Sequence, residues 1–457
     1  MTRLRFRFRY LRHPLSLFGV WLTTVSAVMF LVVFAAELLG VHTNPYIGIV
    51  FFLVLPGLFV LGLLLIPAGV WLMRRRERRG RPEGIEWPVV DMNVPHTRFL
   101  VMAIAGATLV NIVVLSLAAY RGVEYMDSVS FCGQVCHTVM EPEFTAYQHG
   151  PHARVACVHC HIGPGAPWFV KSKLSGTRQL FAVALSTYPT PIPSPVEDLR
   201  PARETCEQCH WPEKFTGDRI RQVHEYADDA ANTETVTTLR LHVGSGQQRL
   251  GATGIHWHMA PSTRVTYITT DPKRHVIPYV RVEDAAGRVV EYRTEGVTDE
   301  ELARGEQRMM DCMDCHNRPS HRFDPTAAAA VNEAMSHGAI PKDLPFVRRE
   351  AVAVLEAQHH SREATQAAIA ARLTAFYRSE HPSVWSGRQA DIERAIRAVQ
   401  DLYSRNVFPH MQVRWGTYPN HIGHVHAPGC FRCHDEGHRS ADGRVIGQDC
   451  STCHTME

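Results

Sequence analysis

The stretch Cys132-Gly-Gln-Val-Cys136-His137 is followed by Cys157-Val-His-Cys160-His161, and the second of these has the form C-x-x-C-H. In that motif two thiols form thioether bonds to a haem, and the histidine that follows ligates the iron. The first stretch has one extra residue between its cysteines. The five-residue pattern recurs at residues 206–210, 312–316, 430–434 and 450–454. We number these motifs one to six in chain order.

The six motifs contain all 12 cysteines of the chain. A disulfide framework or a zinc ribbon gives no reason for a histidine directly after every second cysteine. We therefore expect six covalently bound haem c groups. The attaching cysteines are Cys132, Cys136, Cys157, Cys160, Cys206, Cys209, Cys312, Cys315, Cys430, Cys433, Cys450 and Cys453. The expected proximal iron ligands are His137, His161, His210, His316, His434 and His454.

Composition narrows the class of protein. A chain of 457 residues exceeds a single compact domain. The net charge of +3 is too small to indicate a nucleic-acid partner. The 27 histidines are enough to give every haem a second axial ligand.

Three apolar runs, at residues 15–39, 47–73 and 99–120, are each long enough to span a bilayer. A cleaved signal peptide is the alternative for the first run, but its apolar core would be shorter. No lysine or arginine lies between the first two runs, whereas an arginine cluster separates the second from the third. The positive-inside rule then predicts a multi-pass protein of the bacterial inner membrane, with a cytoplasmic N-terminus and a periplasmic haem domain.

Residues 166–188 mix aromatic and apolar side chains with basic ones. This pattern suits a helix that lies in the headgroup region of a membrane. An ordinary core helix is the alternative. On the interfacial interpretation, Lys171 and Lys173 flank a place where a lipid-soluble quinol would dock.

The order of features around the first three motifs resembles the NapC/NirT family of multihaem quinol dehydrogenases. The resemblance rests on a membrane span, Cys-Gly-Gln-Val-Cys-His-Thr-Val-Met-Glu-Pro at residues 132–142, the spacing to Cys157, and Arg-Glu-Thr-Cys-Glu-Gln-Cys-His at residues 203–210. It implies quinol oxidation at the first haem and electron delivery to a periplasmic redox partner protein. A lysine and a carboxylate would hold or deprotonate the quinol; by the same resemblance these are Lys171 or Lys173, and Asp127. Three spans and the longer first motif depart from the family pattern.

The second axial ligands are less certain from sequence. In the family a methionine can ligate the first haem, and Met140 follows His137 by three residues; soft packing against the haem is the alternative. His152, shortly before the second motif, and His321, shortly after the fourth, are further candidates. At least one of His256 and His258, two residues apart on one face of an expected strand, is expected to ligate. Near the last two motifs the candidates are His424 and His438.

Beyond the third motif, residues 235–241, 264–270, 276–282 and 288–293 are rich in β-branched residues and tyrosine, which predicts a small antiparallel sheet. Residues 326–403 have helical periodicity. The expected fold class is therefore mainly α, with little regular structure around the haems, three transmembrane helices and a small antiparallel β insertion. The expected domains are an anchor (1–125), a NapC/NirT-like domain with haems one to three (126–234), a β-rich insertion (235–310), and a helical, haem-binding C-terminal domain (311–457).

Three functions from different classes remain open. A chain of haems with both axial positions filled suits electron transfer from quinol, because the coordination sphere need not rearrange. A terminal reductase of nitrite or a similar oxyanion would instead need one haem with an open axial site. A purely structural or assembly role is the third alternative. The sequence leaves the oligomeric state open.

Overall fold

The protein is represented by a computed structural model. It describes residues 13–38, 55–78, 92–99, 101–102, 105–106, 109, 120–121, 124–135, 137–195, 200–211, 215–244, 254–358 and 361–456. The chain forms two compact units, Met1–Phe131 with Ile162–Ser175, and Cys132–His161 with Gly176–Glu457. The four-part division expected from the sequence stays a prediction.

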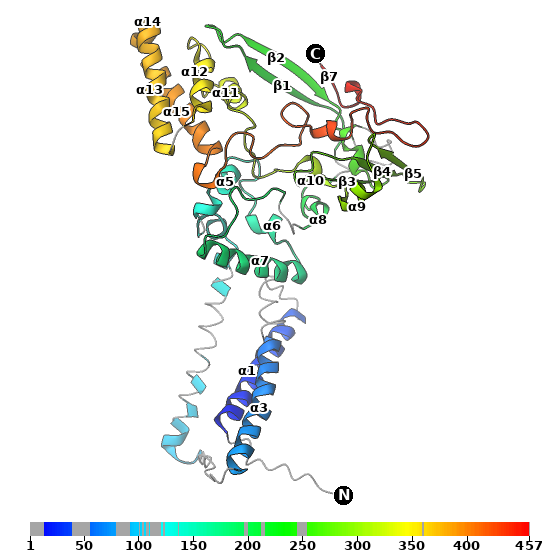
Figure 1. The fold of residues 1–457 in the computed structure, drawn as a ribbon. Helices are drawn as coiled ribbons and strands as arrows, with labels where there is room; N and C mark the ends of the chain where they lie inside the picture. The colour runs from blue at the N-terminus through cyan, green and yellow to red at the C-terminus, as the bar shows by residue number, and fades with distance from the viewer. Residues whose placement is uncertain are drawn as a thin grey trace. The chain divides into compact units, whose positions relative to one another are not determined.

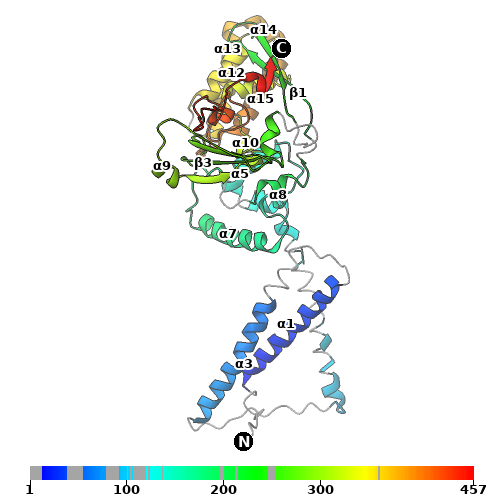
Figure 2. The same ribbon diagram turned by 90° about the vertical axis from the view of Figure 1, so that its right-hand side faces the viewer.

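In the first unit, helices α1 (Pro14–Leu38) and α3 (Leu55–Arg78) lie side by side in both views (Figures 1 and 2). Small residues allow this close approach. A Cβ atom added to Gly19 would lie 2.8 Å from the carbonyl oxygen of Gly62. The Ser16 hydroxyl donates a hydrogen bond of 3.0 Å to the Ile66 carbonyl. Small residues and hydroxyl groups at a helix contact are typical of apolar helices that associate within a membrane.

Among the described residues, one helical stretch, Gly57–Arg76, is long and apolar enough to cross a membrane. Pro14–Met29 is a shorter apolar stretch. Helices α1 and α3 occupy most of the first two expected spans, whose remaining residues lie outside the described ones. Most of the third expected span, residues 99–120, also lies outside them.

In the second unit, the expected helical segment is present as five helices that share one apolar core (Figure 1). They are α11 (Ala327–Ser336), α12 (Val347–Glu356), α13 (Arg362–Glu380), α14 (Pro382–Gly387) and α15 (Gln389–Asn406). Helix α13 begins where Ser361 accepts a hydrogen bond from the Ala364 N–H. Its residues Ile369, Leu373 and Tyr377, spaced by four, are fully buried.

Two antiparallel sheets complete this unit. One has the strand order β1-β2-β7, with β1 Arg219–Tyr226, β2 Glu234–Leu241 and β7 His454–Met456. The other has the order β5-β4-β3-β6, with β3 Arg264–Thr269, β4 Tyr279–Glu283, β5 Val289–Arg293 and β6 Glu306–Met309. The four expected strands correspond to β2, β3, β4 and β5. They do not form one sheet, because β2 pairs with β1 and β7.

The strand expected at His256 and His258 is wrong. Residues Ile255–Met259 form a 3-10 helix. Gly254 precedes it with φ of 71°, and a Cβ atom at that position would overlap the carbonyl oxygen of His242. Glycine therefore permits a sharp turn, which breaks the period of two.

The remaining helices are short, except for α5 and α7. They are α5 (His137–Gln148), α6 (Cys157–His161), α7 (Ala166–Ala184), α8 (Ala202–Cys206), α9 (Asp299–Arg304), α10 (Cys312–Cys315), the π-helix Phe131–Val135, and the 3-10 turns Pro409–Met411, Gly429–Arg432 and Cys450–Thr452. Helices and small antiparallel sheets, as expected in the fold class, are thus confirmed.

Candidate haem-binding sites

Motifs two to six each contain a single short helical turn. The turn is α6 in the second motif, the end of α8 in the third, α10 in the fourth, and a 3-10 turn in the fifth and sixth. In the third, fourth and fifth motifs the N–H of the motif histidine donates to the carbonyl of the first cysteine, at 2.8, 2.8 and 3.1 Å. The turn therefore holds the two thiols and the imidazole close together, and the thiols of these motifs are free to form thioethers.

The first motif is described only in part. Cys132 lies in the π-helix Phe131–Val135. Cys136 and the side chain of His137 lie outside the described residues. Met140 is half-buried in α5. The ligands of the first haem therefore stay predictions.

Each motif histidine with a described side chain faces a second histidine from a distant part of the chain. The distances between ring centroids are 6.1 Å for His161 and His321, 6.1 Å for His210 and His152, 6.4 Å for His316 and His256, 5.9 Å for His434 and His258, and 6.2 Å for His454 and His424. Two imidazoles on opposite sides of one metal ion, each with a nitrogen about 2 Å from it, place their centroids about 6 Å apart. The five pairs therefore have the spacing of paired axial ligands.

Hydrogen bonds orient four of the five facing histidines. Their Nδ1 atoms lie 2.9–3.1 Å from backbone carbonyl oxygens. The pairs are His152 with Pro319, His256 with Val243, His258 with Ile255, and His321 with Glu143. A carbonyl can only accept, so Nδ1 carries the proton and Nε2 is left as the ligating atom. Such a contact is the usual support of a metal-bound histidine.

Desolvation favours the neutral, ligating form of one of these rings. It lowers the pKa of His258, a half-buried residue. A neutral imidazole nitrogen has the lone pair that a metal ligand needs. Among the described residues, no group of three or more His, Cys, Asp or Glu side chains surrounds a common metal position. The donor set thus fits haem, which brings its own four nitrogens, better than a bare ion.

Neighbouring motifs follow one another in space in the order of the sequence. Cys132 and Cys157 are joined by a hydrogen bond, as are Cys206 and Cys312. The thiols of motifs two and three, four and five, and five and six are close enough to interact electrostatically. Cofactors attached at these positions would form a single row from motif one to motif six.

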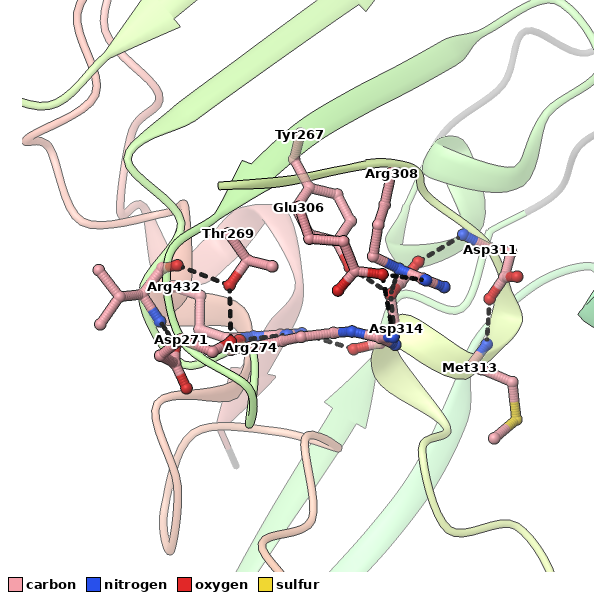
Figure 3. Close-up of polar contacts among 11 residues, drawn as sticks. Tyr267, Thr269, Asp271, Arg274, Glu306, Arg308, Asp311, Met313, Asp314 and Arg432 are labelled. Carbon is pink, nitrogen blue, oxygen red and sulfur yellow. Dashed lines mark hydrogen bonds and ion pairs between the residues drawn. The ribbon is translucent and has the colours of Figure 1, made fainter. Parts of the chain in front are cut away.

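A buried polar cluster joins the fourth and fifth motifs (Figure 3). Asp314, inside the fourth motif, is 2% exposed and accepts a hydrogen bond from the Tyr267 hydroxyl. The guanidinium groups of Arg274 and Arg308 lie 3.8 and 3.7 Å from the same carboxylate oxygen. Arg432, inside the fifth motif, donates to the backbone carbonyls of Asp314 and Arg274. Charged residues between motif cysteines, Asp314 and Arg432, are the one signal of this cluster in the sequence.

His438 is not brought to any motif histidine that the structure describes. It is 1% exposed, and its Nδ1 lies 2.8 Å from Asp435 Oδ1. Its Nε2 lies 2.7 Å from the Ile277 carbonyl oxygen. Both ring nitrogens thus have protein partners, and His438 as a ligand stays a prediction.

The expected quinol-site residues can be described within the first unit. Burial raises the pKa of Asp127, and the positive charge of Lys173 acts in the opposite direction. One carboxylate oxygen of Asp127 is buried without a hydrogen-bond partner. The ammonium groups of Lys171 and Lys173 lie over the rings of Trp168 and Phe169, at 5.1 and 4.7 Å from the ring centroids. A carboxyl group with a raised pKa beside a lysine can accept a proton.

Comparison with known proteins agrees with these features. Residues 94–192 match the family model described as the NapC/NirT cytochrome c family, N-terminal region. The cytochrome c-type protein ImcH of Geobacter sulfurreducens is 45% identical over 450 residues, which cover 98% of this chain and 88% of that protein. No solved structure is significantly similar. The chain therefore belongs to the NapC/NirT cytochrome c family, and as a c-type cytochrome it carries covalently bound haem c and transfers electrons.

Proposed function

We propose that the protein is a membrane-bound hexahaem cytochrome that oxidises a quinol, such as menaquinol, at the periplasmic face of the bacterial inner membrane. Each quinol would release two protons and give two electrons, one at a time, to the first haem. The electrons would then pass along the row of haems to a periplasmic acceptor protein. The observation that carries this proposal is the set of five histidine pairs with centroids about 6 Å apart.

In this proposal the haems of motifs two to six each have two histidine ligands. His321 serves the second haem, His152 the third, His256 the fourth, His258 the fifth and His424 the sixth. When bound, haem supplies the one-electron redox chemistry, and the chain supplies ligands, spacing and electrostatics. A terminal reductase would need an open axial position, and these pairs leave none at five of the six motifs.

Helix α7 and the apolar helices support a membrane-facing quinol site. Leu174 and Phe181, both on α7, are 69% and 62% exposed. Their spacing by seven residues places them on one side of the helix. An exposed apolar stripe on a helix that also carries Lys171 and Lys173 is typical of an interfacial helix. The helical stretch Gly57–Arg76 supports anchoring in the membrane, and the arginines at its end support the cytoplasmic placement of that end.

Lys173 and Asp127 are the proposed proton-handling pair of the quinol site. The positive charge of Lys173 acts on Asp127. The ammonium group would hold a quinol hydroxyl, and the carboxylate would take its proton. Asp127 precedes Cys132 by five residues in the sequence, so a proton would leave close to the point where the first haem is attached.

The test is anaerobic addition of a menaquinol analogue to the oxidised, haem-loaded protein in detergent, followed by haem absorbance. Reduction of the haems is expected, and Lys173→Ala should slow it. Lys342→Ala is a matched control, because that lysine pairs with Glu234 in the other compact unit. Absence of any absorbance change would contradict quinol oxidation, and equal rates in the two variants would remove Lys173 from the site.

A further inference from the structure

His275 and His421 form a histidine pair that belongs to none of the motifs. Their ring centroids are 5.4 Å apart, with an angle of 66° between the rings. His421 is 4% exposed, and neither of its ring nitrogens makes a hydrogen bond of good geometry, although the Asp314 backbone lies close enough to act on its pKa. The Nε2 atom of His275 is also buried without a partner. Buried polar atoms are almost always satisfied in native proteins, so these three nitrogens indicate a ligand or group that belongs between or beside the rings.

The surroundings of the pair favour an anion over a cation. Positive charges of Arg432 and Lys273 act on His275, and those of Arg432 and Arg274 act on His421. The guanidinium of Arg432 donates to three backbone carbonyls. These carbonyls carry no net charge, so they do not neutralise the positive charge of Arg432 near the histidine pair. A metal cation would be repelled by these groups, whereas an anionic oxygen would be attracted.

Among the residues that the structure describes, Asp271 is the acidic side chain that acts on the pair, through His275. Its carboxylate oxygens already accept hydrogen bonds from the backbone N–H groups of Lys273 and Val276, at 2.9 and 2.6 Å. These bonds hold the carboxylate on its own loop. It therefore does not satisfy the free ring nitrogens.

Space for a ligand lies beside His275, and Asn420, the neighbour of His421 in the chain, lines the same space. His275 lines a cavity of about 180 Å³ together with Lys273, Tyr418, Asn420 and His426, among others. The volume is enough for a carboxylate group and a few waters, since one water occupies about 30 Å³ in the liquid.

The pair also lies beside two haem-attachment motifs. The backbone N–H of His421 donates to the Asn317 side chain at 3.0 Å, and Asn317 directly follows His316. Arg432 lies between the two cysteines of the fifth motif and donates to the Asp314 carbonyl inside the fourth. A haem c bound at either motif would bring two propionate carboxylates, which need positive or donor groups when they are buried.

We propose that His275 and His421, under the positive charge of Arg432, bind an anionic carboxylate oxygen, and that this group is a propionate of the haem on the fourth or fifth motif. The pair would act as positioning residues. By donating N–H groups to the propionate they would disperse its negative charge and so raise the reduction potential of that haem. This inference depends on haem attachment and not on quinol oxidation, so the two proposals can fail separately.

The experiment compares His421→Leu and His421→Gln in the complete, haem-loaded protein. Leucine removes both ring nitrogens, whereas glutamine keeps an N–H donor. We expect His421→Leu to lower the midpoint potential of one haem and to shift one propionate band in the resonance Raman spectrum, with His421→Gln restoring much of both. His381→Leu is the matched control, because His381 packs against Phe346 and Phe376 in the helical core.

Two outcomes would overturn the proposal. If His421→Leu leaves all potentials and Raman bands as in the parent protein, the pair holds no propionate. A second outcome is that added phosphate shifts the midpoint potential of one haem in the unmodified protein, and that the shift saturates. If His421→Leu loses this phosphate response while its propionate Raman bands stay unchanged, the site binds a free oxyanion instead. If His421→Leu fails to take up haem, the same comparison can be made at the half-buried His275, with His275→Leu and His275→Gln.

Discussion

Replacing Glu143 with alanine should destabilise the protein and loosen one axial ligand. Both carboxylate oxygens of Glu143 accept hydrogen bonds from Arg318 Nη2, at 2.9 and 2.7 Å. The two side chains are only 12% and 8% exposed. Arg318 also stacks 4.1 Å from the ring centroid of Tyr418 and donates to the carbonyl of His321. Oε2 of Glu143 lies 3.3 Å from Nδ1 of His321, the histidine that faces His161, and alanine removes this contact while keeping the carbonyl that His321 also bonds.

The magnitude follows from the burial of this pair. Removing one partner of a buried ion pair costs about 3–5 kcal/mol, because the other charge stays buried without compensation. Glu143 keeps a little solvent contact, so we expect a loss of about 3 kcal/mol from the free energy of unfolding. Guanidinium unfolding of the haem-loaded protein, followed by far-ultraviolet circular dichroism, would measure it.

Glu141 provides the matched control on the same helix. It pairs with Arg362 at 2.7 Å, but the two side chains are 35% and 34% exposed. A half-exposed pair contributes about 1 kcal/mol or less. Glu141→Ala should therefore lose much less stability than Glu143→Ala and should leave the haems low-spin, whereas Glu143→Ala should add a high-spin signal as His321 loses its support. Equal losses in the two variants would refute this account of the buried pair.

Three further predictions concern other parts of the second unit. His258→Ala should make one haem high-spin and able to bind carbon monoxide when reduced. His438→Ala should not, because His438 bonds Asp435 and the Ile277 carbonyl. Visible absorption spectra distinguish the two variants, and carbon monoxide binding by His438→Ala alone would reverse the assignment. Leu373→Ala removes a fully buried side chain of α13 and should cost about 2–5 kcal/mol in guanidinium unfolding, while a loss below about 1 kcal/mol would show that the helical core is loosely packed. Hydrogen bonds from Lys342, His224 and Tyr226 lower the pKa of Glu234 from 4.5 to about 2. A lowered carboxyl pKa stabilises the fold at pH values above the ordinary pKa. This stabilisation is lost as the pH falls from 4.5 through 2. Glu234→Gln should therefore flatten the acid limb of a plot of melting temperature against pH, and an unchanged acid limb would argue against that role.

The attachment motifs can be recognised in the sequence because each motif is local. Two cysteines and a histidine within five residues fit one helical turn, so residue order alone places them together. The facing histidines depend on tertiary structure instead. His152 lies just before the second motif in sequence, yet it faces His210 of the third, while the second motif is faced by His321. No rule of sequence spacing predicts which histidine faces which motif.

The strands show the same limit. Three-residue β7 is too short to have a recognisable pattern, and it forms because β2 offers a partner edge. The alternation of His256 and His258 indicated a strand, but the positive φ of Gly254 allows a 3-10 turn instead. That turn still presents the two histidines to two different motifs, the fourth and the fifth.

The most direct test of the central claim is quantitative electron paramagnetic resonance of the fully oxidised, haem-loaded protein. If histidine pairs fill both axial positions at motifs two to six, low-spin signals should account for at least five irons per chain. High-spin intensity from two or more irons would contradict the claim, because at least one of the five paired sites would then be open.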